Sequence, residues 1–234
     1  MRAQVHAVKA GSSAGTQSID RTITVIKALS SRGLLGWQLT DLARQCGLSK
    51  STTHRILQCL ASHWIVSRRE RDGLYLPGSF LFSAGLSVPG MRPFYHYATQ
   101  RVASLAQHSK LVASLYFRSA DEAVFVHRAG KAGFSSISHV GSRSQLVTTF
   151  GGVAILLTLP RHTATTIVNR NLAALTESGA SRQHLHRAVY QESRRAGMVV
   201  SDGYLSHDIN IVGVGLPLRS ANGTAFGAVT LMGT

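Results

Sequence analysis

The segment from Ser49 to Leu60 carries the clearest chemical signal in the chain. Read as a helix, it places only polar side chains on one face, those of Lys50, Ser51, His54, Arg55 and Gln58. The segment contains no acidic residue. Phosphates repel carboxylates, whereas a helix face exposed only to water usually mixes acids with bases. An acid-free polar face is therefore typical of a helix that enters the major groove of DNA.

The residue types on this face indicate how DNA would be contacted. A helix N-terminus attracts phosphate through its free amides and its dipole, which favours residues 49–51 as phosphate or early base contacts. Arg55 is long enough to bond guanine O6 and N7 bidentately. His54 and Gln58 are weaker candidates for contacts with base edges. The alternative is that this basic face is only solvated.

A hairpin with a basic tip is predicted directly downstream. Residues 65–68 and 74–76 read as its strands, and Asp72–Gly73 is a strong turn signal between them. The tip carries three arginines, Arg68, Arg69 and Arg71. Such a wing can lie along the DNA backbone or in the minor groove. Arginines at a hairpin tip can also serve only to protect a sheet edge.

The first of two helices expected ahead of the polar-faced helix follows Ser18, a residue suited to an N-cap position. Apolar residues recur in it at steps of three and four, as Ile19, Ile23, Ile26 and Leu29. We expect these four side chains to face the core of a small helical domain.

The second helix and its connection to the third complete a helix-turn-helix pattern. Thr40 offers the cap, and Asp41 places a negative charge at the positive end of the helix dipole. The tight turn Cys46–Gly47–Leu48 then leads into Ser49, which can cap the third helix. The residues expected to face the core in these two helices are Leu42, Ala43, Thr53, Ile56, Leu57 and Leu60. In this arrangement the second helix of the motif enters the major groove.

Composition narrows the class of partner. The 234 residues include 25 Lys and Arg against 10 Asp and Glu, a formal charge of +15, and the pI is near 11.0. This balance favours a polyanionic partner, most simply nucleic acid and less simply an anionic membrane surface. Together with the polar-faced helix, it makes double-stranded DNA the expected partner. No run of apolar residues is long enough to predict a membrane-spanning helix, so no membrane partner is expected. Cys46 and Cys59 lack metal-ligand spacing, which argues against a metal or other cofactor and fits a cytoplasmic protein.

The second half of the chain reads as an α+β domain with a mostly antiparallel sheet. Pro89–Gly90 together with Pro93 mark the expected domain boundary. Helices are expected at residues 95–107, 151–159 and 181–195. Strands are expected at residues 111–117, 123–128, 135–140, 198–201, 211–218 and 224–232.

A competing hypothesis is that the second half is an enzyme acting on a small organic molecule, with the basic N-terminus as an accessory domain. Residues 141–145 lack the final glycine of a nucleophile elbow, and no phosphate-binding glycine loop or metal-ligand set is present. Only six acids follow Met91, which leaves few acid–base pairs. We therefore expect no enzyme. A third hypothesis is a non-specific, chromatin-like binder, which the charge favours and a second folded domain of this size disfavours.

A set of short motifs follows along the chain in a fixed order. They are Ser18–Ile19–Asp20–Arg21, Leu42–Ala43, Gly47–Leu48–Ser49–Lys50–Ser51–Thr52, Arg55–Ile56–Leu57 and Tyr75–Leu76–Pro77–Gly78. Together they closely resemble the N-terminal domain of the IclR-type transcriptional regulators. Residues 141–157, 197–203 and 214–219 are more loosely similar to C-terminal segments of the same family.

The resemblance implies a domain plan. Residues 1–17 would be a flexible basic tail, residues 18–77 a winged helix-turn-helix DNA-binding domain, and residues 78–93 a linker helix and hinge. Residues 94–234 would be a GAF-like α+β effector-binding domain. The family implies a sequence-specific transcriptional regulator whose operator binding is modulated by a small organic effector. It also implies a homodimer or a dimer of dimers.

The resemblance also extends the set of candidate site residues. The DNA-binding residues then expected are Arg21, Ser49, Lys50, Ser51, Thr52, His54, Arg55, Gln58, Arg68, Arg69 and Arg71. Members of the family line their effector pocket from the C-terminal segments, which implies effector contacts from Phe150, Gly151, Ser201, Asp202, Thr230 and Met232.

Departures from the family pattern modify the expected effector site. The positions that usually hold His, Pro and Lys are Val147, Gln145 and Val153 here, and Phe150 replaces a small residue. These changes imply either a less polar ligand than a small keto acid or a poorly functioning pocket. The sequence stops at Thr234, before the helix that follows the last strand in the family, so the domain is expected to lack that helix.

Overall fold

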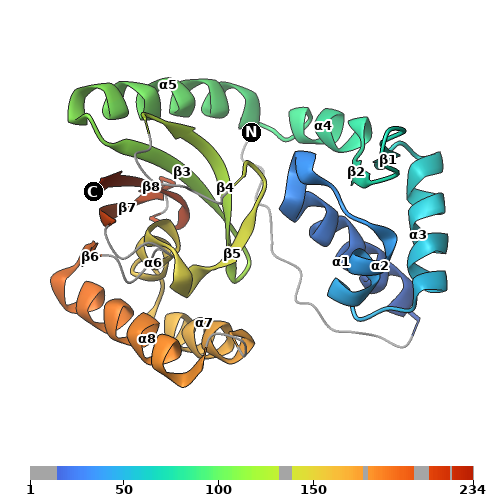
Figure 1. Ribbon diagram of the computed structural model, residues 1–234. Coiled ribbons are helices and arrows are strands. Elements are labelled where there is room, and N and C mark those ends of the chain that lie inside the picture. Colours follow the sequence, from blue (N-terminus) through green and yellow to red (C-terminus); the bar gives the residue numbers. More distant parts are fainter. Residues whose placement is uncertain (1–14, 132–138, 176–178, 203–210, 222, 234) are drawn as a thin grey trace. The chain divides into compact units, whose positions relative to one another are not determined.

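The computed structural model describes residues 15–131, 139–175, 179–202, 211–221 and 223–233. The chain divides into two compact units, residues 1–83 and 84–234 (Figure 1). Most of the expected basic tail, residues 1–14, lies outside the described part. Among the described residues, no helix combines the length and the apolar character needed to cross a bilayer.

Helices form most of the N-terminal unit. Helix α1 (Gln17–Arg32) continues through the short 3-10 turn η1 (Gly33–Leu35) to α2 (Leu39–Gln45) and α3 (Lys50–Ser62). Helix α4 (Ser79–Leu86) closes the unit and runs into the second one. All four helices fall in segments where the sequence predicts helix.

Two short strands form the wing. Strands β1 (Val66–Arg68) and β2 (Tyr75–Pro77) pair antiparallel, with Arg68 opposite Tyr75. The wing packs on the helices through a single cluster of apolar side chains: Val25, Leu29, Trp37, Leu42, Leu57, Leu60, Val66 and Tyr75. The expected winged helix-turn-helix is confirmed.

Helix α1 buries a different edge from the one expected. Val25 and Leu29 are buried, but Ile19 and Ile23 expose 57% and 43% of their surface. At 3.6 residues per turn, the Ile19–Ile23 edge lies roughly a third of a turn away from the buried one. The prediction that all four apolar residues of this stripe face the core is therefore wrong for two of them.

Two predicted caps are also wrong. Helix α1 begins at Gln17 after Thr16, which makes no side-chain capping bond, so Ser18 lies inside the first turn. Helix α2 begins at Leu39 with Gln38 at the N-cap position, so Thr40 lies inside it. In both cases the helix starts before the hydroxyl residue.

A six-stranded sheet forms the C-terminal unit, in the order β5-β4-β3-β8-β7-β6, and every pairing described in it is antiparallel. Its strands are β3 (Val112–Ser119), β4 (Glu122–Ala129), β5 (Arg143–Gln145), β6 (Val199–Asp202), β7 (Val212–Arg219) and β8 (Ala225–Gly233). The α+β class with an antiparallel sheet is confirmed.

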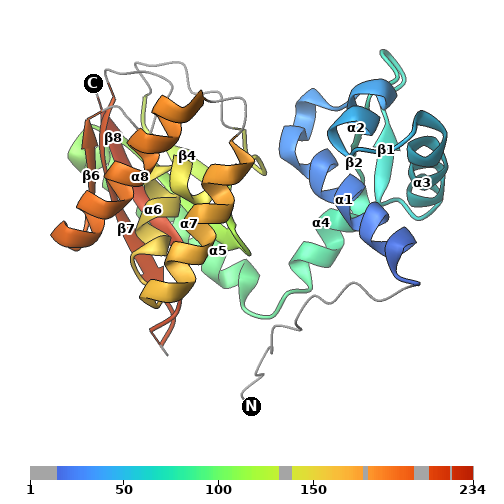
Figure 2. The same cartoon turned by 90° about the horizontal axis from the view of Figure 1, so that it is seen from below.

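Helices cover both faces of this sheet (Figure 2). Helix α5 (Met91–Ser109) packs on one face against Ala113 and Leu115. On the other face, a larger core joins α6, α7 and α8 to Val112 and Tyr116. These helices span Phe150–Leu156, Arg161–Ala174 and Gly179–Ala196, and the 3-10 turn η2 (Leu146–Thr148) precedes α6.

The C-terminal unit departs from expectation in four places, one of which is strand β5 (Arg143–Gln145), which was not predicted. Helix α5 begins at Met91, so Pro93 lies in its first turn, where the missing N–H of proline costs no helical hydrogen bond. Helix α7 was not predicted. Of the strand expected at residues 135–140, residues 135–138 lie outside the described part, while His139 and Val140 are not in a strand.

Candidate functional site

The turn between α2 and α3 fixes the start of α3. Gly47 adopts φ +62°, a left-handed conformation that suits glycine, directly after the helix ends. The Leu48 amide donates to the Ala43 carbonyl (3.0 Å), which closes the turn. Leu42 and Ala43 are buried as predicted, so α2 holds the turn against the core.

Ser49 caps α3, as the sequence predicts. Its Oγ accepts from the Thr52 amide (3.2 Å) and donates to the Thr52 Oγ1 (2.8 Å). The buried Thr53 hydroxyl donates to the Ser49 carbonyl (3.0 Å). These bonds leave the start of α3 ordered while Ser49, Lys50 and Ser51 remain exposed.

The two faces of α3 separate as predicted. Thr53, Leu57 and Leu60 are buried and Ile56 is half-buried. The opposite face exposes the side chains of Lys50, Ser51, His54, Arg55 and Gln58. Within the described part of the chain, the Lys50, His54, Arg55 and Gln58 side chains make no hydrogen bond or ion pair, so their polar groups are available to a ligand. Arg21 is likewise exposed, on α1.

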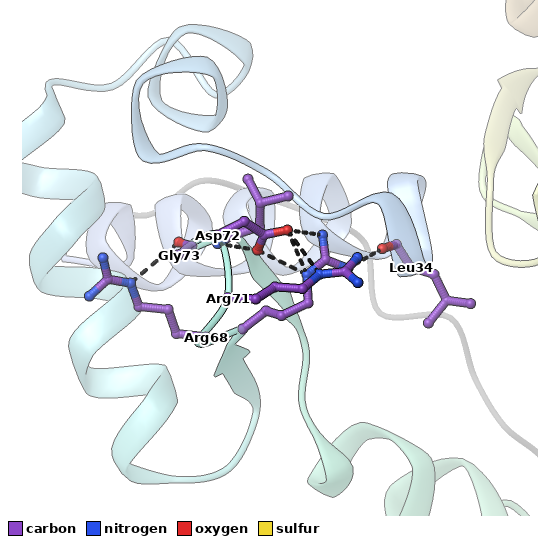
Figure 3. A network of polar contacts seen from close by, with 7 residues as sticks. Leu34, Arg68, Arg71, Asp72 and Gly73 are labelled. Atoms are coloured by element: carbon purple, nitrogen blue, oxygen red, sulfur yellow. Dashed lines mark hydrogen bonds and ion pairs between the residues drawn. The ribbon is translucent and has the colours of Figure 1, made fainter.

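The wing arginines differ in their contacts (Figure 3). Arg69 Nε donates to both Asp72 carboxylate oxygens (2.9 and 3.0 Å), and its Nη1 donates to the Leu34 carbonyl (2.9 Å). Arg71 is 76% exposed and reaches Asp72 only through Nε, at 3.4 Å. Arg68 donates to the Gly73 carbonyl (3.3 Å) and stays exposed. Hydrogen bonding from Arg69 lowers the pKa of Asp72 to about 2.

The start of the second wing strand is attached to the segment between α1 and α2. Trp37 and Tyr75 exchange two backbone hydrogen bonds of 2.9 Å, which adds a bridge beside β2. The Trp37 indole donates to the Ala28 carbonyl (2.8 Å), and the Arg32 guanidinium lies 3.8 Å from the ring centroid. Sequence reasoning missed Asp72 and Leu34 as wing contacts; the Arg69–Asp72 spacing is the signal that indicates the first of them.

In the C-terminal unit, four predicted effector residues meet where α6 crosses the sheet. Phe150, Gly151, Thr230 and Met232 are all buried. The Phe150 ring packs over β7, so that a Cβ on Gly213 would lie 2.9 Å from it. Register places Ser201 opposite Gly213 and Asp202 beside it on β6, but both of these side chains lie outside the described part.

Two buried hydroxyls lie on the same sheet face. Ser114 on β3 and Thr230 on β8 are register partners, and both are less than 2% exposed. Neither hydroxyl has a hydrogen-bond partner among the described residues. Arg128 is the register partner of Ser114 on β4, and burial lowers the pKa of its guanidinium. Ser114 was not predicted, although a small polar residue inside an apolar strand is a usable signal.

A separate surface hollow of about 360 Å³ lies on the α5 side of the C-terminal unit. Its walls include Phe94, Phe117, Phe226 and Arg118, and none of the predicted effector residues. Among the described residues, no cluster of three or more His, Cys, Asp or Glu side chains could hold a metal ion.

Comparison with protein families gives two matches. Residues 18–70 match the family described as the IclR helix-turn-helix domain, and residues 91–234 match that described as the bacterial transcriptional regulator IclR C-terminal domain. The HTH-type transcriptional regulator XynR of Escherichia coli (strain K12) is 25% identical over 128 residues, which are 54% of this chain and 50% of XynR. The match thus spans about half the length of this curated relative.

Solved structures share the fold at low identity. An IclR transcriptional regulator from Alicyclobacillus acidocaldarius is 22% identical, with a TM-score of 0.68, over 93% of this chain and 87% of that one. An IclR homolog from Microbacterium hydrocarbonoxydans, complexed with 4-hydroxybenzoate, is 19% identical with a TM-score of 0.68, over 92% and 88%. An IclR family regulator from Brucella abortus is 17% identical with a TM-score of 0.71, over 98% and 86%.

Proposed function

This chain belongs to the IclR family of bacterial transcriptional regulators, and we propose that it binds an operator as a cytoplasmic homodimer in response to a small organic effector. Proteins of this family act as transcriptional regulators, with a DNA-binding helix-turn-helix domain and a ligand-binding C-terminal domain. The family does not in general consist of enzymes. The operator contacts, the dimer and the effector site are argued in turn below.

The observation that carries DNA reading is the free polar face of α3. Its cations and amides have no competing partner among the described residues, and no acid lies from Ser49 to Leu60. We assign base contacts to His54, Arg55 and Gln58 and phosphate contacts to residues 49–52. Arg21, Arg68 and Arg71 are exposed and supply further phosphate contacts. Arg69 is considered separately below.

Selection of bound fragments from genomic DNA tests this assignment. We expect the purified protein to enrich fragments that share one motif in two symmetric half-sites, spaced about 34 Å or a multiple of it along the duplex. Enrichment of every sequence equally would instead favour the chromatin-like binder. No retention of any duplex at low salt would exclude both.

Helix α4, which is uncharged and is not buried by any described residue, favours a dimer. None of the eight residues of α4 is buried, and Phe80 and Phe82 expose 51% and 72% of their surface. A helix this apolar is normally covered. A second copy is the occupant that also supplies the second recognition helix of a symmetric operator.

Sedimentation checks the dimer. Phe82→Glu should convert the dimer to a monomer, because a carboxylate in an apolar interface loses its hydration. Gln107→Glu, which adds a charge at an exposed position of α5, should leave the dimer intact. An unchanged sedimentation coefficient for Phe82→Glu would place the interface elsewhere.

The effector site that we propose lies between α6 and the sheet. Ser114 and Thr230 offer hydroxyls that lack partners among the described residues, and Phe150 and Met232 supply apolar contacts beside them. Gly151 lets α6 approach closely, since a Cβ there would lie 2.5 Å from the Tyr116 ring. Such surroundings suit a compact molecule with an apolar body and few polar groups, and 4-hydroxybenzoate, bound by the Microbacterium homolog, is an aromatic ring with one carboxylate and one hydroxyl.

Thermal shift with a panel of hydroxybenzoates tests the effector site. At least one member should raise the unfolding temperature of the native protein, and Thr230→Val should abolish the shift because it removes the hydroxyl at nearly constant volume. Thr166→Val, at an exposed threonine of α7, is the matched control and should retain it. A shift that survives in Thr230→Val would place the ligand elsewhere.

A further inference from the structure

Arg69 is bound at every nitrogen of its guanidinium, unlike the other wing arginines. Nε donates to both oxygens of Asp72, Nη2 lies 2.8 Å from Asp72 Oδ2, and Nη1 donates to the Leu34 carbonyl at 2.9 Å (Figure 3). Its side chain is 25% exposed, against 76% for Arg71. Planar, multidentate hydrogen bonding of this kind fixes the orientation of an arginine side chain.

The bond to Leu34 joins parts of the chain that are distant in sequence. Leu34 lies in η1, the connection from α1 to α2, 35 residues before Arg69. The bridge between Trp37 and Tyr75 ties the same connection to the first residue of β2, next to the turn of the wing. The turn of the hairpin and the adjoining start of β2 are therefore both attached to the segment that leads into the helix-turn-helix.

Asp72 organises the tip from within. It accepts from Arg69, from Arg71 and from the Leu74 amide (3.3 Å), so it also closes the turn. Gly73 follows at φ +69°, and its amide donates to the Arg69 carbonyl (2.8 Å). An acid on a DNA-binding surface weakens binding through repulsion of the phosphates, so its presence there calls for a structural role. Holding the guanidinium of Arg69 is such a role.

We propose that Arg69 is a positioning residue, which with Asp72 and Leu34 holds the wing in a fixed orientation relative to α3 and makes no phosphate contact of its own. The inference rests on the proposed DNA binding by this unit. It divides the wing: Arg69 supports, while Arg68 and Arg71 contact DNA. The wing and α3 then meet a duplex as one rigid surface, which sharpens discrimination between sequences more than it raises affinity.

Salt dependence separates a supporting arginine from a contacting one. Binding of the full chain to a pool of random 30-base-pair duplexes is measured over a range of salt concentrations. Arg71→Gln should make the slope of log K against log salt shallower by about 0.9 per protomer, the value for one lost phosphate contact, and so by about 1.8 for the dimer. Arg69→Gln should leave the slope unchanged. An equal loss of slope in both variants would overturn the proposal.

Asp72→Asn distinguishes the effect of the Asp72 charge on DNA binding from its role in holding Arg69. If the acid only repels DNA, this variant should bind a selected genomic fragment more tightly, with unchanged preference over the random pool. If it holds Arg69, the ratio of the two affinities should fall by about tenfold, similar to the loss of one base contact, although net charge rises. Tighter binding at constant preference would overturn the proposal.

Arg69→Lys adds a test at constant charge. A lysine cannot bond Asp72 at two oxygens and the Leu34 carbonyl together, so preference for the selected fragment over the random pool should fall as it does in Asp72→Asn. Retained preference in Arg69→Lys would mean that charge alone matters there. Circular dichroism of each variant confirms that the unit remains folded. If the native chain binds no duplex, the proposed function itself fails, which is distinct from native binding with a wing that tolerates these changes.

Discussion

Helices α3 and α6 begin in the same way and lie in opposite surroundings. The Ser49 hydroxyl caps α3 by accepting from the Thr52 amide (3.2 Å), and the Thr149 hydroxyl caps α6 by accepting from the Gly152 amide (3.0 Å). All seven residues of α6 are buried, whereas α3 buries only Thr53, Leu57 and Leu60. One helix can meet a macromolecule from outside, and the other can meet only what enters the domain.

A glycine near the start of each helix shows the same difference between an exposed and a buried site. A Cβ on Gly47, before α3, would meet nothing within 4 Å, so this glycine serves the turn alone. A Cβ on Gly152 in α6 would lie 2.2 Å from the Leu146 carbonyl oxygen. An exposed site therefore depends on which side chains are present, while an interior site depends on how closely backbones approach.

The largest expected effect of a single substitution lies in α6. Gly152→Ala should destabilise the C-terminal unit by about 4 kcal/mol, because the methyl group meets backbone that cannot move aside. Cys59→Ala, at an exposed position of α3, should change stability by less than about 0.5 kcal/mol. Urea denaturation of both variants measures the contrast. Equal stabilities would mean that α6 repacks as freely as a surface helix.

The two caps allow a matched comparison of intermediate size. Ser49→Ala and Thr149→Ala should each lower the free energy of unfolding by about 1 kcal/mol, since each leaves a helix amide without its acceptor. Only Ser49→Ala should also weaken DNA binding, because α3 carries the exposed face. Denaturation and fluorescence anisotropy with a duplex give both quantities. Weakened DNA binding in Thr149→Ala would show that the two helices act together.

The smallest expected effects concern the pKa values of side chains, which are shifted by different causes in the two units. Hydrogen bonding from Arg69 lowers the pKa of Asp72 to about 2, whereas burial raises the pKa of Tyr116 to about 12. The ionised Asp72 stabilises the folded state. This contribution to the free energy of unfolding is complete above the ordinary aspartate pKa of about 3.9 and is lost as the pH falls through about 2. It should be modest, because the pair is partly solvated.

Carbon-13 NMR of the carboxyl groups measures this titration. In Arg69→Gln the midpoint of Asp72 should return toward its ordinary value, since the principal hydrogen-bond donor is gone. A midpoint that stays near 2 in Arg69→Gln would show that the Leu74 amide and Arg71 alone account for the lowered pKa.

The recognition surface could be predicted from sequence because it is local. The polar face of α3 and its Ser49 cap follow from residue types and helical spacing within one segment. Helix α1 could not be resolved in the same way. Its apolar stripe is wide, and only contacts with Trp37 and Leu42, distant in sequence, decide that Val25 and Leu29 are buried while Ile19 and Ile23 are not.

The interior of the C-terminal unit depends on contacts that sequence does not display. Asn171 of α7 is buried and accepts from the Val147 amide, while it donates to the Asp121 carbonyl and the Gln145 side chain. A polar residue at such a position interrupts the apolar face of α7 without removing its helical spacing. Its apolar residues Ala164, Ile167, Val168 and Leu172 do recur at helical spacing, so this helix could have been found.

The most direct test of DNA reading by α3 is the affinity of Arg55→Ala for a selected genomic fragment and for its single-base-pair variants. On the selected fragment, Arg55→Ala should lose about 1–3 kcal/mol of binding free energy relative to the native protein. On the variant that changes the base pair read by Arg55 in each half-site, the two proteins should bind equally, because the native protein can no longer make that contact. Arg44→Ala, at an exposed arginine of α2, should show no such position. An equal loss on every variant would make Arg55 a phosphate contact and would contradict base reading by this face.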